Sequence, residues 1–318
     1  MSNPNEQARA IMETILQPAG TSPHTGLIGL GLMGRGMGLS LLRAGHTLHL
    51  VAHRKRDIAQ ELLAAGAHEA ATPQALAAAC EAIVLCLPSV ETTEAVLFGP
   101  QGIVWGAPPG LLVIECSTLL REAGRSFAQR LAAAGVDFVD APVTRGPTEA
   151  VAGRLNALVG GAPAAVERAL PVLQAFCERT FRFGASGQGY AAKLVNNFLA
   201  FNNLVAIAEA MHTAQSAGLN TQELLAAIAV SGGQNRVLDG LAPWLTGAGE
   251  SRSRVTLATA HKDVQYYARL AESLATLGPV AQQVERSLAQ ALHNGLGEQF
   301  TPEYLRHISH RGAQGSSE

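Results

Sequence analysis

The stretch Gly26-Leu27-Ile28-Gly29-Leu30-Gly31-Leu32-Met33-Gly34 decides the fold of the first half of the chain. It places the pattern G-x-G-x-x-G between a short apolar run and a predicted helix. In that context Gly29 permits a tight turn, Gly31 lets the backbone approach a pyrophosphate, and Gly34 lets helix and strand pack closely. The N–H groups of the helix N-terminus then face the phosphates. A turn with a purely structural role is the alternative, but the context favours a dinucleotide site formed by Gly29, Leu30, Gly31, Leu32, Met33 and Gly34.

The residues that follow this turn alternate between strand-like and helix-like segments. Apolar runs predict strands at residues 25–30, 47–52, 82–87, 111–116 and 137–140, with two more at the far edge, 155–159 and 180–183. Helices are predicted between them at residues 35–44, 55–65, 73–80, 92–97 and 122–134. Strands and helices that alternate at this spacing predict βαβ units and a parallel sheet.

The second half of the chain has a different pattern. Residues 190–216 contain neither Gly nor Pro and predict one long helix, which Gly218 ends. Further helices are predicted at 221–230, 261–277, 280–292 and 302–307, with a loop at 240–253. The predicted fold is an α/β Rossmann domain followed by an all-α domain, joined by a long interdomain helix. The predicted divisions are a flexible N-terminal extension at 1–24 with at most one short helix at 7–16, domains at 25–187 and 188–310, and a flexible tail at 311–318.

Composition narrows the classes of partner. The 318 residues include 23 Lys and Arg against 25 Asp and Glu, and aromatic residues make up only 5%. This balance lacks the basic excess and the rings that nucleic-acid binding favours. We find neither an apolar run of membrane-spanning length nor a secretory signal, and therefore expect a cytoplasmic protein with no membrane partner. The four cysteines follow no C-x-x-C pattern, which predicts reduced, buried thiols at Cys80, Cys86, Cys116 and Cys177.

The end of the second predicted strand bears on the choice of dinucleotide. An NAD site usually has an acidic residue there, which binds the ribose 2′-OH. Here His53, Arg54 and Lys55 are followed by Arg56, and no acid occurs before Asp57. Because such cations can bind a 2′-phosphate, this cluster predicts that NADP(H) is preferred over NAD(H). A solvated helix start is the alternative.

Four ordered motifs make the chain resemble the β-hydroxyacid dehydrogenase family, which includes 3-hydroxyisobutyrate dehydrogenase, tartronate semialdehyde reductase and sulfolactaldehyde reductase. They are the glycine turn, Asp140-Ala141-Pro142-Val143-Thr144-Arg145-Gly146 closed by Gly153-Arg154-Leu155, Gly187-Gln188-Gly189-Tyr190-Ala191-Ala192-Lys193-Leu194-Val195-Asn196-Asn197, and His261-Lys262-Asp263. The resemblance implies hydride transfer between a nicotinamide cofactor and a short 3-hydroxy acid or its semialdehyde, without a metal. It also implies self-association through the helical domain, as a dimer or tetramer.

Lys193 and Asn197 are the candidate catalytic residues. They stand four apart in the long predicted helix and therefore share one face. Hydride transfer at a hydroxyl carbon needs one group that exchanges the hydroxyl proton and another that orients the oxygen. The resemblance implies that Lys193 is the general acid/base and that Asn197 orients the substrate. A solvent-exposed lysine with no catalytic role is the alternative.

The segment Thr144-Arg145-Gly146 departs from the Ser-Gly-Gly that is common in the family. Arg145 adds a planar cation that could bind a carboxylate, sulfonate or phosphate, unless it points to solvent. The predicted substrate-binding residues are Ser117, Thr144, Arg145, Gly146, Asn196 and Gln234. On the cofactor side, the ends of strands and the resemblance add Leu87, Pro88, Ser89, Thr118 and Lys262.

The sequence thus predicts an NADP-preferring 3-hydroxyacid dehydrogenase or semialdehyde reductase. Two alternatives remain at this stage. One is an imine reductase-like enzyme, which Lys193 disfavours because related folds with that activity replace this lysine. The other is a non-catalytic NADP(H)-binding protein.

Overall fold

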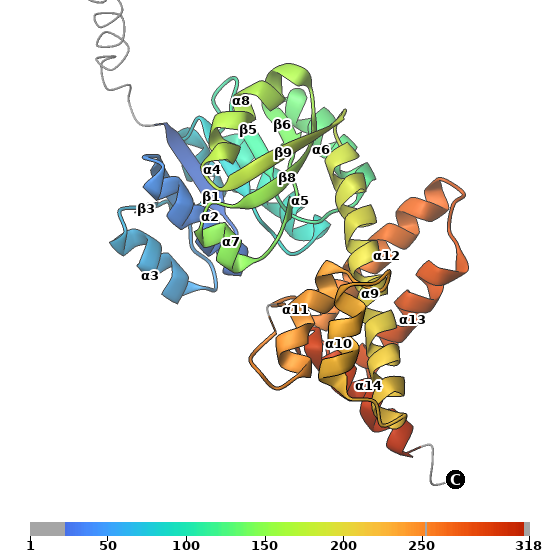
Figure 1. Ribbon diagram of the computed structural model, residues 1–318. Helices are drawn as coiled ribbons and strands as arrows, with labels where there is room; N and C mark the ends of the chain where they lie inside the picture. The colour runs from blue at the N-terminus through green and yellow to red at the C-terminus, as the bar shows by residue number, and fades with distance from the viewer. Residues whose placement is uncertain (1–22, 252, 315–318) are drawn as a thin grey trace, which may run out of the picture.

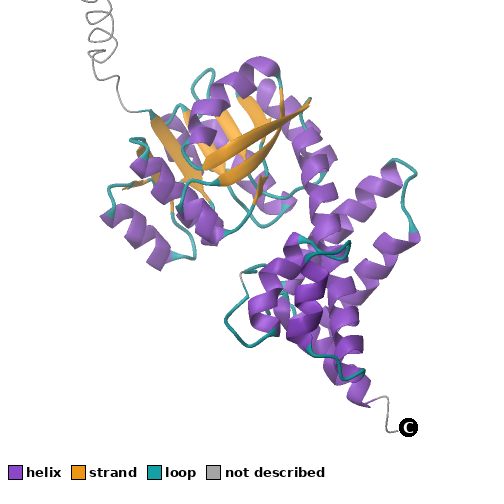
Figure 2. Ribbon diagram, in the orientation of Figure 1, coloured by secondary structure: helices purple, strands orange, loops and turns teal. Residues whose placement is uncertain are grey.

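The computed structural model describes residues 23–251 and 253–314 (Figure 1). The short helix predicted at 7–16, and nearly all of the predicted N-terminal extension, lie outside the described residues. Within them, Figure 2 shows strands gathered in the first half of the chain and helices alone packing together in the second. This is the predicted fold class.

One sheet of nine strands organises the first half. Its order is β3-β2-β1-β4-β5-β6-β8-β7, and β9 pairs with β8. The strands are β1 (His24–Ile28), β2 (Thr47–Val51), β3 (His68–Glu69), β4 (Ala82–Leu85), β5 (Leu112–Glu115), β6 (Asp137–Asp140), β7 (Val143–Thr144), β8 (Leu155–Gly161) and β9 (Cys177–Gly184).

The prediction of a parallel sheet holds from β3 through β6 and again for β8 with β9. It is wrong for the pairs that β8 forms with β6 and β7, because β8 runs antiparallel to both of these strands. The chain between β6 and β8 contains only β7 and the short helix α7 (Pro147–Val151). A connection this short reverses the chain direction, whereas a parallel neighbour would need a longer crossover.

Helices cover both faces of the sheet. On one face α2 (Leu32–Arg43), α3 (Arg56–Ala64) and α8 (Pro163–Gln174) pack with α7 around a shared apolar core. On the other face lie α4 (Pro73–Ala78), α5 (Val90–Phe98) and α6 (Arg121–Ala132). Side chains of consecutive strand residues point to opposite faces of the sheet. Leu27 therefore packs in the first core and Ile28 in the second.

The helical half is built around α9 (Gln188–Ser216), which leaves the sheet and continues through the second half (Figure 1). The other helices are α10 (Thr221–Ala229), α11 (Arg236–Leu245), α12 (Leu257–Ser273), α13 (Pro279–His293) and α14 (Pro302–Gln314). A third apolar core, with Leu204 of α9 and Leu288 of α13, joins them. The division at 187/188 falls between the end of β9 at Gly184 and the start of α9 at Gln188, and we keep it as a proposal.

Two predictions in this half need correction. The loop predicted at 240–253 begins with helix as far as Leu245, because the buried side chains of Leu238 and Leu241 pack on the helical core despite Gly240 and Pro243. The tail predicted from residue 311 begins as helix, since α14 extends to Gln314. Across the described residues, none of the helices combines the length and apolar character needed to cross a membrane.

The cysteines are all free thiols. Cys80, Cys116 and Cys177 are buried, and Cys86 is half-buried. Burial raises the pKa of the Cys80, Cys86 and Cys177 thiols to about 12, so they stay protonated near neutral pH.

Candidate active site

The glycine turn has the geometry that a dinucleotide requires. Gly29 has φ +108°, and a Cβ there would lie 2.1 Å from the carbonyl oxygen of Cys86. A Cβ on Gly34 would lie 1.9 Å from the carbonyl oxygen of Gly29, so both positions need glycine. Around Gly31, by contrast, a Cβ would meet no atom within 4 Å. Gly31 is the N-cap of α2 and provides no side-chain hydrogen bond, which leaves N–H groups of the helix N-terminus for a phosphate.

The predicted cluster at the end of β2 lies on the surface. His53, Arg54 and Lys55 are exposed, and Arg56 forms an ion pair with Glu69 at 2.5 Å. In the described part of the chain, neither Arg54 nor Lys55 has a hydrogen-bond or ion-pair partner. Two unpaired cations beside the glycine turn fit an anionic group on the cofactor's ribose.

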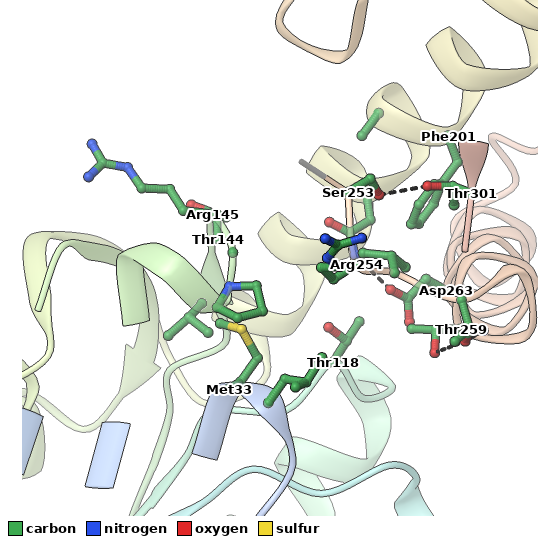
Figure 3. A pocket seen from close by; sticks show the side chains of 18 of the residues that line it. Met33, Thr118, Thr144, Arg145, Phe201, Ser253, Arg254, Thr259, Asp263 and Thr301 are labelled. Carbon is green, nitrogen blue, oxygen red and sulfur yellow. Dashed lines mark hydrogen bonds between the residues drawn. The ribbon is translucent and has the colours of Figure 1, made fainter. Parts of the chain in front are cut away.

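A cavity of about 780 Å³ opens between the sheet and the helical half (Figure 3). Its wall includes residues of the predicted cofactor-binding set and residues of the predicted substrate-binding set. Leu30, by contrast, is buried in the core of the sheet domain. The predicted residues that line it are Leu32, Met33, Leu87, Pro88, Ser117, Thr118, Thr144, Arg145, Gly146, Lys193, Asn196, Asn197 and Lys262.

Asp140 at the end of β6 fixes the start of α9. Its carboxylate accepts hydrogen bonds from the N–H groups of Gly187, at 2.7 Å, and Tyr190, at 3.2 Å. It thereby satisfies N–H groups that a helix N-terminus leaves without partners. Burial raises the pKa of Asp140 to about 6, although these backbone donors oppose the rise. Asp140 therefore couples the sheet edge to the first turn of the helix that carries Lys193.

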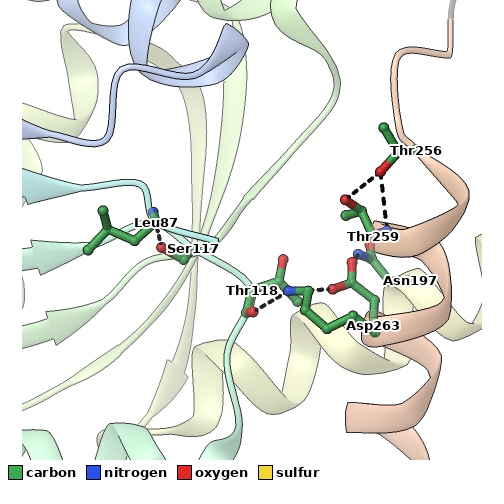
Figure 4. A network of polar contacts seen from close by, with 8 residues as sticks. Leu87, Ser117, Thr118, Asn197, Thr256, Thr259 and Asp263 are labelled. Atoms are coloured by element: carbon green, nitrogen blue, oxygen red, sulfur yellow. Dashed lines mark hydrogen bonds and ion pairs between the residues drawn. The ribbon is translucent and has the colours of Figure 1, made fainter. Parts of the chain in front are cut away.

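A polar network surrounds the candidate catalytic residues (Figure 4). The side-chain N–H of Asn197 donates to Asp263 at 2.7 Å, and Lys262 forms an ion pair with the same carboxylate at 3.0 Å. Lys262 also donates to the carbonyl oxygen of Thr118 at 3.0 Å. It therefore links the helical half to the loop after β5, a contact that the sequence did not predict.

Lys193 differs from its neighbours because its amine has no hydrogen-bond partner among the described residues. Burial lowers its pKa from 10.5 to about 8; the Asp263 carboxylate opposes the shift and the Lys262 cation adds to it. An amine with a pKa near working pH can both donate and accept a proton. Its location on the cavity wall leaves it available to a ligand.

A second buried network stands behind the loop after β5, and no motif in the sequence predicted it. The Glu115 carboxylate accepts hydrogen bonds from the Ser117 N–H at 3.1 Å, the Ser117 hydroxyl, and the Tyr190 hydroxyl at 2.5 Å. Burial raises the pKa of Glu115 to about 7, while these hydrogen bonds oppose the rise. The Ser117 hydroxyl also accepts from the Leu87 N–H at 2.6 Å. Ser117 is thus engaged in positioning the loop. An acid in the apolar run at 111–116 was the only sequence signal.

The segment after β6 does not have the predicted arrangement. Arg145 has φ +75°, and its guanidinium donates to the carbonyl oxygen of Arg154 and forms an ion pair with Glu178. Figure 3 shows its side chain pointing away from the other labelled residues. Arg145 lines the cavity, but its guanidinium would have to leave Glu178 to bind a substrate anion, so its predicted role stays a prediction. The Gly146 N–H is also occupied, by Glu149 at 3.1 Å, and the Thr144 hydroxyl accepts from Asn156 at 3.3 Å.

Gln234 and Ser89 are among the predicted residues that do not line the cavity. Gln234 is exposed and donates to Asp239 at 2.9 Å, and Ser89 caps α5 by accepting from the Thr92 N–H at 3.2 Å. The wall instead includes residues that sequence reasoning missed: Arg236, Ser251, Ser253, Arg254 and Thr301. Most lie in connections between helices, where no motif signals them. Within the described residues, no group of His, Cys, Asp and Glu is arranged to hold a metal.

Comparison with known proteins identifies the family. Residues 24–184 match the model of the NAD binding domain of 6-phosphogluconate dehydrogenase, and residues 187–308 match that of the NAD-binding region of NADP-dependent 3-hydroxyisobutyrate dehydrogenase. The chain belongs to the β-hydroxyacid dehydrogenase family. Like its relatives it is an NAD(P)-dependent oxidoreductase of the kind that acts on small hydroxy acids.

Individual relatives differ in substrate. The chain is 30% identical to 2-(hydroxymethyl)glutarate dehydrogenase of Eubacterium barkeri, over 75% of this chain and 79% of that one. It is 32% identical to 3-hydroxyisobutyrate dehydrogenase of Pseudomonas aeruginosa, over 68% and 72%. The structure of 3-hydroxyisobutyrate dehydrogenase from Salmonella typhimurium has a TM-score of 0.81 at 27% identity, covering 90% and 99%. An imine reductase from Myxococcus stipitatus shares the fold, with a TM-score of 0.62 at 19% identity over 90% and 99%.

Proposed function

We propose that this family member is an NADP(H)-preferring enzyme that interconverts a short anionic 3-hydroxy acid and its semialdehyde, with Lys193 as general acid/base. The observation that carries the proposal is the Lys193 amine, which stands on the cavity wall without a protein partner and has a pKa of about 8. The lysine also argues against imine reduction, in which related folds replace it.

The chain's own residues perform the proton chemistry in this proposal. A bound nicotinamide supplies or accepts the hydride. In the reducing direction the Lys193 ammonium donates a proton to the carbonyl oxygen of the semialdehyde, which becomes the hydroxyl; in the oxidising direction the neutral amine takes that proton back. Asn197 donates one N–H to Asp263, and the second N–H of its amide remains for the substrate oxygen. Asp263 thereby holds Asn197 in its orienting position.

Support for the cofactor comes from the glycine turn and from Arg54 and Lys55. The pyrophosphate would bind at Gly31 and the helix N-terminus, and the 2′-phosphate would bind between the two cations. Leu32, Met33, Leu87 and Pro88 line the sheet side of the cavity and would give a bound nicotinamide an apolar wall. Thr118, held by Lys262, completes that wall.

The proposal can be tested by following NADPH consumption with small semialdehydes that bear a carboxylate, sulfonate or phosphate, with parallel assays in NADH. We expect turnover with at least one of them and faster reaction with NADPH at limiting cofactor. If no member of the panel is turned over, the proposal fails and the non-catalytic NADP(H)-binding alternative gains support.

We also propose a dimer or tetramer formed through the helical half. Val195 and Leu199 lie one turn apart on α9 and are 47% and 57% exposed, an apolar pair that self-association would remove from water. Sedimentation at micromolar concentration tests this proposal, and a monomer would contradict it.

A further inference from the structure

The cavity extends well beyond the proposed reacting centre. On α9 its lining continues from Lys193 through Asn197 and Phe201 to Leu204. These residues share one helix face, and the eleven-residue separation corresponds to about 16 Å along the axis. With bonds of about 1.5 Å, a four-carbon hydroxy acid would fill only part of that length. The structure therefore offers room for a substrate with an additional chain.

Two arginines line the same cavity from the helical half, and neither has a strong partner. Arg236 is the first residue of α11, where the helix dipole disfavours a cation, and it has no hydrogen-bond or ion-pair partner within the described segments. Arg254, in the connection before α12, pairs at 2.6 Å with Glu250, whose side chain is 83% exposed. Exposed ion pairs of this kind contribute little stability, so a ligand anion can replace Glu250.

The remaining groups of this end of the cavity suit a chain that ends in an anion. Figure 3 shows Ser253 hydrogen-bonded to Thr301 beside Phe201, on the opposite side of the cavity from Met33 and Thr118. Phe201, Leu204, Val237, Leu241 and Val255 supply apolar wall. Two carboxylates also line the cavity, but both have partners: Asp263 with Asn197 and Lys262, and Glu149 with the Gly146 N–H.

We propose that Arg236 and Arg254 bind a second anionic group at the far end of the substrate. The substrate would then be a 3-hydroxy acid or semialdehyde whose side chain is a short apolar linker ending in a carboxylate or phosphate. This inference rests on the proposed function for the position of the reacting centre. The anion contacts come from residues that the predicted site did not include.

The kinetic test compares three semialdehydes that differ only in the chain on the carbon between carboxylate and aldehyde: propyl, carboxyethyl or phosphoethyl. We expect the wild-type kcat/KM to favour an anion-ended chain over propyl by about tenfold or more, and the preferred chain identifies the anion. Arg254→Ala should raise KM about tenfold for that substrate, with little change in kcat. The same variant should leave KM and kcat for the propyl substrate unchanged. Arg254→Lys should give an intermediate KM, because lysine keeps the positive charge but lacks the planar guanidinium that binds an anion through two hydrogen bonds.

A matched control and a binding assay separate this inference from the proposed function. Arg286→Ala removes an exposed arginine of α13 that lies outside the cavity and should change no parameter. Calorimetric titration with glutarate needs no turnover: Arg236→Ala and Arg254→Ala should each weaken its binding about tenfold. If glutarate binding shows this dependence but no semialdehyde reacts, the anion site stands and the proposed function fails. Equal wild-type kcat/KM for all three chains, or equal effects of Arg254→Ala on all three, would overturn the anion site.

Discussion

The two walls of the cavity differ in whether their polar groups have hydrogen-bond or ion-pair partners within the protein. On the sheet side Ser117 is bonded to Glu115, the Gly146 N–H to Glu149, and Arg145 to Glu178. On the helical side Asn197, Lys262 and Ser253 are also bonded within the protein, but Lys193 and Arg236 have no partner among the described residues. A polar group satisfied by the protein shapes the site, whereas one without a partner is available to a ligand. This difference supports the two proposals that place proton transfer and anion binding on the helical side.

The largest effect should come from the helical side. Lys193→Ala removes the proposed acid/base and should lower turnover by about 10²–10⁴-fold, the usual contribution of a positioned proton donor. Cofactor affinity should hardly change, because the glycine turn and the basic cluster lie on other elements. Lys193→Arg should not restore activity, since a guanidinium does not release its proton near neutral pH. Turnover close to that of wild type in a folded Lys193→Ala variant would refute the mechanism.

The pH dependence should have opposite signs in the two directions. Reduction needs the Lys193 ammonium, so its kcat/KM should be constant below about pH 8 and fall above it, approaching tenfold per pH unit. Oxidation needs the neutral amine and should rise up to about pH 8 and then level. Rate profiles measured in both directions test this. If the two profiles had the same sign, another group would be exchanging the proton.

A variant of Asp263 sharpens the same test. The Asp263 carboxylate raises the pKa of Lys193 against the lowering effect of burial. Asp263→Asn removes that charge, so both profiles should move to lower pH. Because Asp263 also accepts from Asn197 and pairs with Lys262, we expect kcat to fall as well. A shift of the pH profile to lower pH indicates that the Asp263 charge acts on the pKa of Lys193. A merely structural role of Asp263 would lower the rate without shifting the profile.

Cofactor discrimination should be a smaller effect, confined to the surface of the sheet domain. Arg54→Ala should weaken NADPH binding about tenfold, or about 1.4 kcal/mol, and should hardly alter NADH binding, because only NADPH carries the 2′-phosphate. Fluorescence titration with both cofactors measures the difference. Equal losses for the two cofactors would remove the basis for the predicted preference.

What the sequence could predict depends on how local the cause is. The glycine turn, the apolar strands and the run of residues 190–216 without Gly or Pro are local signals, and the structure contains the turn, the strands and the long helix they predict. The cap of α9 is not local, because Asp140 reaches Gly187 across 47 residues. The partner of Arg145 is 33 residues away at Glu178, and the lining by Arg236 and Arg254 depends on how the helices pack. These features need the folded chain.

The smallest effect should therefore come from the arginine that the sequence singled out. Arg145 is exposed and lines the cavity, but its guanidinium is paired with Glu178 and points away from the other labelled residues in Figure 3. Losing this surface pair should cost roughly 0–1 kcal/mol of stability. Because the guanidinium is engaged with Glu178, Arg145→Ala should change KM for the substrate by less than about threefold and leave kcat as it is. Arg254→Ala, assayed beside it on the same anion-ended substrate, should have the larger effect on KM. If Arg145→Ala instead raises KM as much as Arg254→Ala does, Arg145 leaves Glu178 when substrate binds. The sheet side would then bind substrate as well as shape the site, and the contrast between the walls would fail.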